Sequence, residues 1–443
     1  MNEPTETPGA PSPRLDPELA RPVPAADKYA VLRIRNFQLY LCGRFIAAFG
    51  QQMLGTALGW EIYERTRDFG ALGLVGLATI VPLLLLTLPA GHVADQYNRR
   101  NIILWMEVLT AVGCLGFTVV SYFHVPVAWT YVFIMVSAAA RSFLWPASSA
   151  FLPQIVPREH LAAAVTWNSG SFQISAALGP AVGGLVIAHT LMPSLVYGFN
   201  VVAALACAGL LYFVHTRPGS PKKPSSMSLE NLAAGLKFVF ATPIILATIT
   251  LDLFAVLLGG ATALMPVYAR DILHVGASGQ GWLQSALPIG SACMAFVLAH
   301  RPPMQKAGRS LLLAVAGFGV ATIIFGLSRN FWLSLAMMFL CGAMDNISVV
   351  VRQTLVQLLT PDQLLGRVSA INMLFIGTSN EFGEFESGFV AKYFLGPINT
   401  VVFGGVGTVL VVVATGLIWP SLRRFGRLDG SDDAPSALPN KAA

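Results

Sequence analysis

The chain has 443 residues, of which 55% are hydrophobic and only 11% charged, and its formal net charge is +6. A soluble globular protein carries about 25% charged residues, so this composition argues against a soluble enzyme and favours a membrane protein. The sequence contains no Gly-rich phosphate loop and no metal-ligand spacing, so we expect no ATP-driven motor, no enzymatic activity, no metal and no cofactor.

The first half of the chain predicts six membrane spans. Residues 1–30 are rich in proline, alanine and acidic residues, which predicts a disordered cytoplasmic tail and no cleavable signal peptide. Residues 31–214 follow as a predicted six-helix bundle. Its apolar segments are about 20 residues long and begin near Phe37, Leu72, Ile102, Trp129, Leu161 and Pro193.

The second half repeats this arrangement after a cytoplasmic linker at residues 215–242. The linker contains "TRPGSPKKPSS" and an amphipathic stretch, "SLENLAAGLKFVF", which we expect to lie on the inner membrane surface. A second bundle at 243–422 precedes a disordered tail at 423–443. The fold class is therefore an all-α polytopic membrane protein with about twelve transmembrane helices in two pseudo-symmetric six-helix bundles. The second set of spans begins near Ile244, Gln280, Leu311, Phe331, Leu364 and Pro397.

The basic residues predict the topology. Lysine and arginine gather in the two tails and in every second loop, whereas the alternate loops hold few of them. This pattern places both termini in the cytoplasm of a multi-pass protein of a bacterial-type cytoplasmic (inner) membrane. Because topology accounts for the basic charge, we expect no nucleic-acid partner.

The two halves are related by an internal repeat. "VPREHLAAAVTWN" (Val156 to Asn168) aligns without gaps on "TPDQLLGRVSAIN" (Thr360 to Asn372), at an offset of 204 residues. Two related six-helix halves are typical of secondary transporters, in which one half rocks against the other. A channel or an intramembrane enzyme has no need of that symmetry.

The predicted cytoplasmic loop "GHVADQYNRR" carries a family resemblance. It resembles the signature of the major facilitator superfamily between the second and third helices, with Gln96 and Asn98 as departures. The resemblance implies an inner gate that holds the cytoplasmic ends of the two halves together and releases them on switching. An ordinary topology-setting basic loop is the alternative. The residues that match the gate are Gly91, Asp95, Arg99 and Arg100.

The fifth span contains "SAALGPAVGG", which resembles the fifth-helix signature of superfamily members that exchange substrate for protons. Small residues permit close approach of a facing helix, and a proline bends its own helix, so tight packing alone is the alternative. "CGRFIAAFG", "WEIYERT" and "RSFLWPASSAFLPQIVP" further resemble the enterobactin-exporter-like branch of efflux permeases. The packing motif comprises Gly179, Pro180, Gly183 and Gly184, with Ser175 at the first glycine position.

Four charges lie in the first, fourth, seventh and tenth spans, namely Arg44, Arg141, Asp252 and Asp345. The resemblance implies that these helices line a central cavity, and buried charges in membranes are functional candidates by default. Arg141 plus 204 gives Asp345, so these two are pseudo-symmetry mates at similar depth. They either bind substrate and change partners during transport, or form a static ion pair. Both aspartates are also candidates for proton coupling.

The eleventh span carries three glutamates, Glu381, Glu384 and Glu386. Glu381 and Glu384 share a helix face, and two carboxylates so close in a low-dielectric site do not both ionise readily. We therefore predict a protonation site at the outer closure, facing the second span near Gly73 and Gly76. Two alternatives are a structural network with rim cations (Arg65, Arg67 or Lys392) and direct recognition of a cationic substrate.

Taken together, the sequence predicts a monomeric secondary transporter that exports a small amphipathic molecule, such as a siderophore, drug or metabolite, in exchange for protons. Its partners are the substrate, protons and the lipid bilayer. The alternatives on the same fold are an uptake or facilitated-diffusion permease and a lipid or lysolipid flippase. Glu61 and Glu107 are expected to form structural ion pairs, and the sequence assigns no role to Glu386.

Overall fold

The structure is a computed structural model that describes residues 29–215, 229–259, 261–302 and 304–426. Most of the predicted tails and the proline-rich core of the linker lie outside these residues. The described chain is helical, and its N-terminal half consists of six long helices. These are α1 (Arg35–Thr66), α2 (Phe69–Gln96), α3 (Arg99–Tyr122), α4 (Ala128–Ile155), α5 (Leu161–Thr190) and α6 (Pro193–Tyr212).

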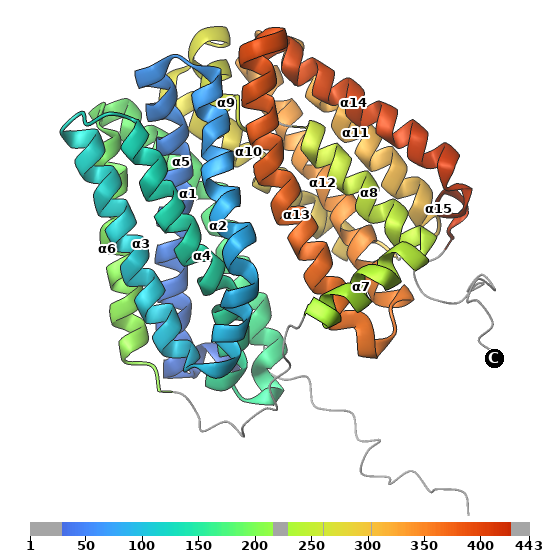
Figure 1. Cartoon of the computed structure of the whole chain (residues 1–443), viewed down its shortest axis with the longest axis horizontal. Coiled ribbons are helices and arrows are strands. Elements are labelled where there is room, and N and C mark those ends of the chain that lie inside the picture. The colour runs from blue at the N-terminus through green and yellow to red at the C-terminus, as the bar shows by residue number, and fades with distance from the viewer. Residues whose placement is uncertain (1–28, 216–228, 260, 303, 427–443) are drawn as a thin grey trace, which may run out of the picture.

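The C-terminal half adds six more long helices, which gives the predicted twelve (Figure 1). Each predicted start lies within four residues of a helix start in the structure. By length and composition alone, eight segments, or nine with one bent pair, are apolar enough to cross a membrane. The helices are α8 (Pro243–Leu258), α10 (Gly276–Ala299), α11 (Ala307–Leu327), α12 (Phe331–Leu359), α13 (Asp362–Val390) and α14 (Gly396–Ile418), followed by the short α15 (Pro420–Arg424).

Polar residues in the short loops begin several helices. Asp68 accepts a hydrogen bond from the Gly70 amide at 2.9 Å, and Asn330 accepts one from the Trp332 amide at 2.9 Å. A capping side chain satisfies an amide at the first turn that no helical carbonyl reaches. Capping residues of this kind in the loops therefore mark where some of the helices begin.

The linker helix is confirmed as α7 (Leu229–Ala241), which meets α8 at a bend of 100°. It packs against the beginning of α13, where a Cβ on Gly235 would lie 3.2 Å from the Cβ of Arg367. Val239 is buried in the same contact, beside Ile371. The helix is thus joined to the C-terminal bundle through its apolar face.

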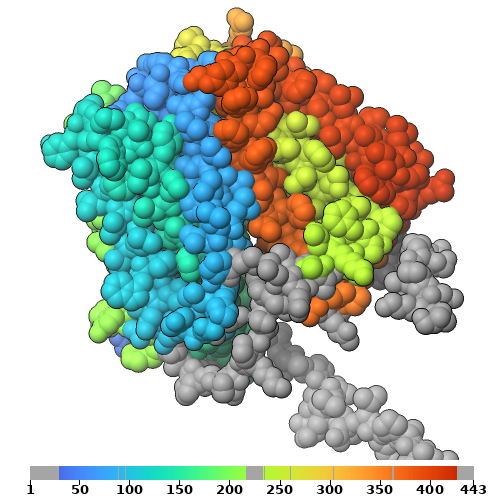
Figure 2. Space-filling model, in the orientation of Figure 1, coloured from blue at the N-terminus to red at the C-terminus, as the bar shows by residue number. Residues whose placement is uncertain are grey.

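The repeat offset of 204 relates the contacts that join the two halves. α5 packs on α10, and α2 packs on α13. Figures 1 and 2 show α2 and α13 side by side. Gly184 of α5 meets Ala277 of α10, and adding 204 to 184 gives Gly388 of α13. Subtracting 204 from 277 gives Gly73 of α2, which Gly388 meets. The contact of α5 with α10 and the contact of α2 with α13 are therefore pseudo-symmetric equivalents.

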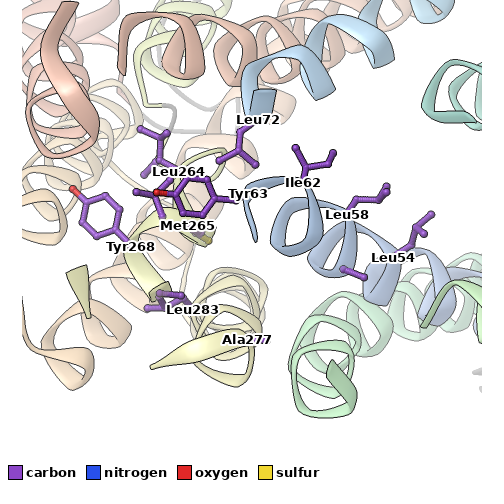
Figure 3. Close-up of a cluster of buried hydrophobic side chains, with 14 of the residues drawn as sticks. Leu54, Leu58, Ile62, Tyr63, Leu72, Leu264, Met265, Tyr268, Ala277 and Leu283 are labelled. Carbon is purple, nitrogen blue, oxygen red and sulfur yellow. The ribbon is translucent and has the colours of Figure 1, made fainter. Parts of the chain in front are cut away.

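The halves meet at the end of the molecule where α1 is followed by α2, which we call the closed end. An apolar cluster there draws on both halves, because Leu58, Ile62 and Tyr63 of α1 pack with Leu264 and Met265. Figure 3 shows the Tyr63 ring beside Met265 and Leu264. Burial of these side chains stabilises the contact by about 1.5–3 kcal/mol for each large residue.

The seventh span is broken rather than continuous. α8 ends at Leu258, and the chain resumes in a short α9 (Met265–Val267) and a π-helical turn, η4 (Tyr268–Ile272). The irregular backbone between them contains Thr262 and Ala263, which line a cavity. Non-helical backbone at membrane depth is tolerated where it lies within protein or lines a cavity, which accounts for this break.

Candidate functional site

A cavity of about 510 Å³ lies between the two halves, next to the closed end. We call it the central cavity. α1, α2, α3, α4 and α5 line one side, and the broken seventh span, α10 and α13 line the other. Of the four helices that the resemblance placed at the cavity, the tenth (α12) contributes no lining residue in the described chain. The charged lining residues there are Arg141, Glu381 and Glu384, and the amides are Gln51, Gln52 and Gln284.

Arg141 of α4 pairs with Glu381 of α13 across the central cavity. The Nη2–Oε1 distance is 3.7 Å, and the side chains are 46% and 23% exposed. The alternative in which Arg141 and Asp345 form a static ion pair is therefore wrong for this conformation. Equal depth in two repeats does not imply contact, because the cavity wall opposite α4 comes from α13 instead of α12. An ion pair between the halves contributes only when the halves are close.

Glu384 lines the same cavity one helical turn further along α13. A Cβ added to Gly76 of α2 would lie 3.1 Å from the Cβ of Glu384, so the predicted position opposite Gly76 is confirmed, whereas Gly73 faces Phe385 and Gly388. Among the described residues, Glu384 has no hydrogen-bond or ion-pair partner. It is therefore the carboxylate of this cavity that is free to bind a proton or a cation.

The alternative network with the rim cations does not form. Lys392 pairs with Asp68 at 2.6 Å, and Arg65 pairs with Glu61 at 3.2 Å, as expected for Glu61. The third glutamate of the cluster, Glu386, accepts a hydrogen bond from the Ser387 hydroxyl at 3.5 Å and is absent from the cavity lining. It thus serves as an internal comparison for the two cavity glutamates.

The seventh-span aspartate, Asp252, lies inside the C-terminal half and pairs with Arg352 of α12. The side chains of this pair are only 8% and 3% exposed, and neither lines the central cavity. Asp345 lies two turns along α12 from Arg352 and has no ion-pair partner in the described part of the chain. Both aspartates were predicted at the cavity, and the structure places both away from its lining.

Arg44 is likewise absent from the cavity lining. It pairs with Glu107 of α3 at 3.3 Å, and Glu107 is only 2% exposed. This confirms the structural pair expected for Glu107 and identifies its partner. Since both residues belong to the N-terminal half, the pair holds α1 to α3 in that half.

Sequence reasoning missed the polar contacts that cross between the halves near the cavity. The Thr56 hydroxyl of α1 donates to Gln284 of α10 at 2.5 Å, and Gln280 donates to the Thr56 carbonyl at 3.1 Å. An uncharged amide in an apolar segment is a weaker sequence signal for a functional site than a charged residue. Their spacing of four residues, which places both on one face of α10, was the available signal.

The fifth-helix motif permits the predicted close approach. A Cβ on Gly179 would lie 3.1 Å from the Phe49 carbonyl oxygen, and one on Gly183 would lie 3.0 Å from the Met53 Cα, both on α1. On the other side, Gly184 and Pro180 contact α10 at Ala277 and Gly281. The motif therefore packs α5 against its own half and against the opposite half.

In the described part of the chain, the predicted inner-gate arginines donate hydrogen bonds within the N-terminal half. Arg99 donates to the Ala150 carbonyl of α4 at 3.1 Å, and Arg100 donates to the Leu211 carbonyl of α6 at 3.0 Å. The Asp95 side chain lies outside the described part of the structure. In this conformation the two arginines connect helices within one half, and their role between the halves stays a prediction.

Ion pairs connect the halves at the closed end. Arg270 pairs with Glu64 and lies 5.8 Å from the Trp60 ring, and Arg67 lies 3.8 Å from Asp271. Their C-terminal members sit in π-helical turns, as does Lys392 in η5 (Ala391–Leu395). Such turns are rare and often occur at functional sites. We therefore identify this cluster as the contact that must separate when the closed end opens.

A second cavity, of about 610 Å³, borders this cluster and is lined by residues of both halves. Its charged lining residues are Glu61, Glu64, Arg65 and Arg270, and all four are engaged in ion pairs. The central cavity is smaller, but among the described residues it contains an unpaired carboxylate, Glu384. It is therefore the better candidate for substrate binding.

Removing the closed-end cations should favour opening of that end. An exposed ion pair contributes about 0.2–1 kcal/mol, so Arg270→Gln with Lys392→Gln should shift the equilibrium towards the open state by about two- to thirty-fold. Spin labels on the exposed loop positions Phe123 and Arg329, in a cysteine-free background, would report the change as longer distances. Unchanged distances would mean that these pairs do not hold the end closed.

A family model described as Major Facilitator Superfamily matches residues 40–384. Among curated relatives, an enterobactin exporter, EntS, of Escherichia coli O1:K1 / APEC is 24% identical over 393 residues. That alignment covers 88% of this chain and 93% of the relative.

Solved transporter structures share the fold. A bacterial homolog of the human lysosomal transporter Spinster, in an inward-facing and unoccupied conformation, aligns with a TM-score of 0.68 at 14% identity. This alignment covers 88% of this chain and 97% of that one. The POT family transporter PepTSo aligns with a TM-score of 0.68 at 12% identity, covering 88% and 98%. Identities this low support the twelve-helix fold and leave the substrate open.

Proposed function

The chain belongs to the Major Facilitator Superfamily, and from this premise we propose that it is a proton-coupled exporter of a small amphipathic molecule. The observation that carries the proposal is the presence of two glutamates, Glu381 and Glu384, in the central cavity, with Arg141 reaching Glu381 from the opposite half. The similarity to an enterobactin exporter supports export over uptake.

The geometry supports coupling between protonation and the arrangement of the halves. An ionised Glu381 attracts Arg141 across the cavity, whereas a protonated Glu381 loses that attraction. If protonation changes the free-energy difference between two conformations, then the two conformations bind the proton with different affinities. Repulsion between Glu381 and Glu384 adds to this coupling, because a proton on either one relieves it.

The predicted topology indicates which side of the membrane the closed end faces. With both termini in the cytoplasm, the closed end faces away from the cytoplasm. Hydrogen bonds and ion pairs join the halves at the cavity and nearer to the closed end, as for Arg141 with Glu381, Tyr63 with Asp271 and Lys392 with Asp68. We therefore assign an inward-facing state that receives substrate from the cytoplasm. The same predicted topology supports a location in a bacterial-type cytoplasmic (inner) membrane.

Proton movement in inverted vesicles tests the proposal. Vesicles are energised, the interior pH is followed by dye fluorescence, and a panel of siderophores, antibiotics and lipophilic cations is added. At least one compound should release protons through the wild-type protein. The Glu381→Gln, Glu384→Gln variant should reduce that release to the level of vesicles without the transporter.

Glu386→Gln is the matched control, because it removes a carboxylate from the same helix outside the cavity. It should release protons like the wild type. Equal release through the double variant would move the carrier elsewhere, to Asp345 or Asp252. No release for any compound, from protein that is folded and inserted, would contradict proton-coupled export.

A further inference from the structure

Three charged side chains line the described part of the central cavity, and two of them neutralise each other. Arg141 and Glu381 form an ion pair at 3.7 Å, so the only lining cation is already engaged by a carboxylate. Glu384 remains, and no described residue pairs with it. When both glutamates are ionised, the cavity therefore presents one surplus negative charge.

The other lining residues in the described part of the chain carry no charge for a ligand. The polar lining residues are amides and hydroxyls, such as Gln51, Thr79 and Ser137, and neutral groups of this kind orient a ligand without selecting its charge. Apolar residues, including Leu54, Phe117 and Ile134, surround them. A ligand that fits this wall has an apolar body and few polar groups.

Burial makes the surplus charge selective. Glu384 is only partly exposed and lies against α2 at Gly76, where a Cβ would come within 3.1 Å of its own Cβ. A partly buried carboxylate is in a medium of lower dielectric constant than bulk solvent, so it attracts an opposite charge and repels a like charge more strongly than in bulk solvent. Glu384 should thus favour cations over anions of the same shape.

We infer that the substrate of this transporter is an amphipathic monocation whose positive charge contacts Glu384. A cavity of about 510 Å³ is within the range that holds a drug-sized molecule, so the apolar body and the charge can both be accommodated. This inference rests on the proposed transport function and narrows its substrate class. It disfavours polyanionic cargo, because such cargo would face Glu384 with no free cation in the described lining.

Two ions of nearly the same shape and opposite charge provide the test. Tetraphenylphosphonium and tetraphenylborate are offered to the purified full-length protein in detergent without a proton gradient, and binding is measured by equilibrium dialysis. A second pair, dodecyltrimethylammonium and dodecyl sulfate, is used at concentrations below micelle formation. The cation of each pair should bind, and the anion should bind at least about tenfold more weakly.

Variants locate the charge that is responsible. Glu384→Gln should weaken binding of the cations about 10- to 100-fold, whereas Glu386→Gln should leave it unchanged. Arg141→Gln should strengthen it about three- to tenfold, since it releases Glu381 from its ion pair. A merely structural role for Glu384 would not produce these opposite shifts.

The outcomes separate this inference from the proposed function. Preferred binding of the anions, binding unaffected by Glu384→Gln, or no binding of either cation would overturn the substrate class. Cation binding that depends on Glu384, with no proton release in vesicles, would uphold the class and contradict proton coupling. Proton release by neutral or anionic compounds alone would uphold coupling and contradict the class.

Discussion

Replacing Arg352 with methionine, or Asp252 with valine, should lower the free energy of unfolding by about 3–5 kcal/mol, because each change leaves a buried charge without its partner. The pair connects α12 to α8, and the two residues are 2% and 6% exposed. Combining both substitutions should restore stability close to that of the wild type. A well-packed apolar pair avoids the desolvation of two charges.

Unfolding titrations in mixed micelles would measure the three variants against the wild type. If each single variant were as stable as the double variant, the pair would not be desolvated as the structure indicates. The double variant also separates stability from function. Since neither Asp252 nor Arg352 lines the central cavity, we expect it to retain substrate-driven proton release.

The helices were predictable because the signal is local. Long apolar segments alternate with short loops, some of which supply helix caps, as at Asp68 and Asn330, and the predicted starts lie within four residues of those in the structure. The repeat offset likewise predicts related positions from sequence alone. Gly184 and Gly388, which are 204 residues apart, make equivalent contacts.

Contacts between the halves were less predictable, because they depend on which conformation is formed. Arg141 and Asp345 are equivalent by the repeat, yet Arg141 meets Glu381, since α13 and not α12 borders the cavity at this end. The glutamates were placed correctly opposite α2, at Gly76, because that contact depends on helix register and small residues. Side-chain pairing across a moving interface carries no such local signal.

Arg352 illustrates a different omission. It lies seven residues before the end of α12, where an arginine is easily assigned to the cytoplasmic boundary of a span. The structure buries it, because Asp252 approaches from α8 and satisfies its charge. A complete inventory of charges within the predicted spans would have identified Arg352, although not its partner.

A bulky residue at Gly73 should open the closed end and abolish transport, which is the largest functional effect that we expect from a single substitution. A Cβ at this position would lie 2.8 Å from the carbonyl oxygen of Phe385 and 3.1 Å from the Cα of Gly388. These are backbone atoms of α13, which cannot move aside as a flexible side chain can. Gly73→Leu therefore forces α2 and α13 apart, and a transporter that cannot close one end cannot complete its cycle.

Spin-label distances between Phe123 and Arg329 should lengthen in Gly73→Leu, and substrate-driven proton release should cease. Gly73→Ala should destabilise the closed state relative to the open state by about 1–3 kcal/mol, the usual cost of overpacking. This corresponds to a shift of about 5- to 150-fold in the conformational equilibrium. Gly209→Leu is the matched control, because Gly209 has open space beside it. It should change neither quantity. Wild-type distances and transport in a folded Gly73→Leu protein would show that α2 and α13 do not separate, and would place the moving contact at α5 and α10 alone.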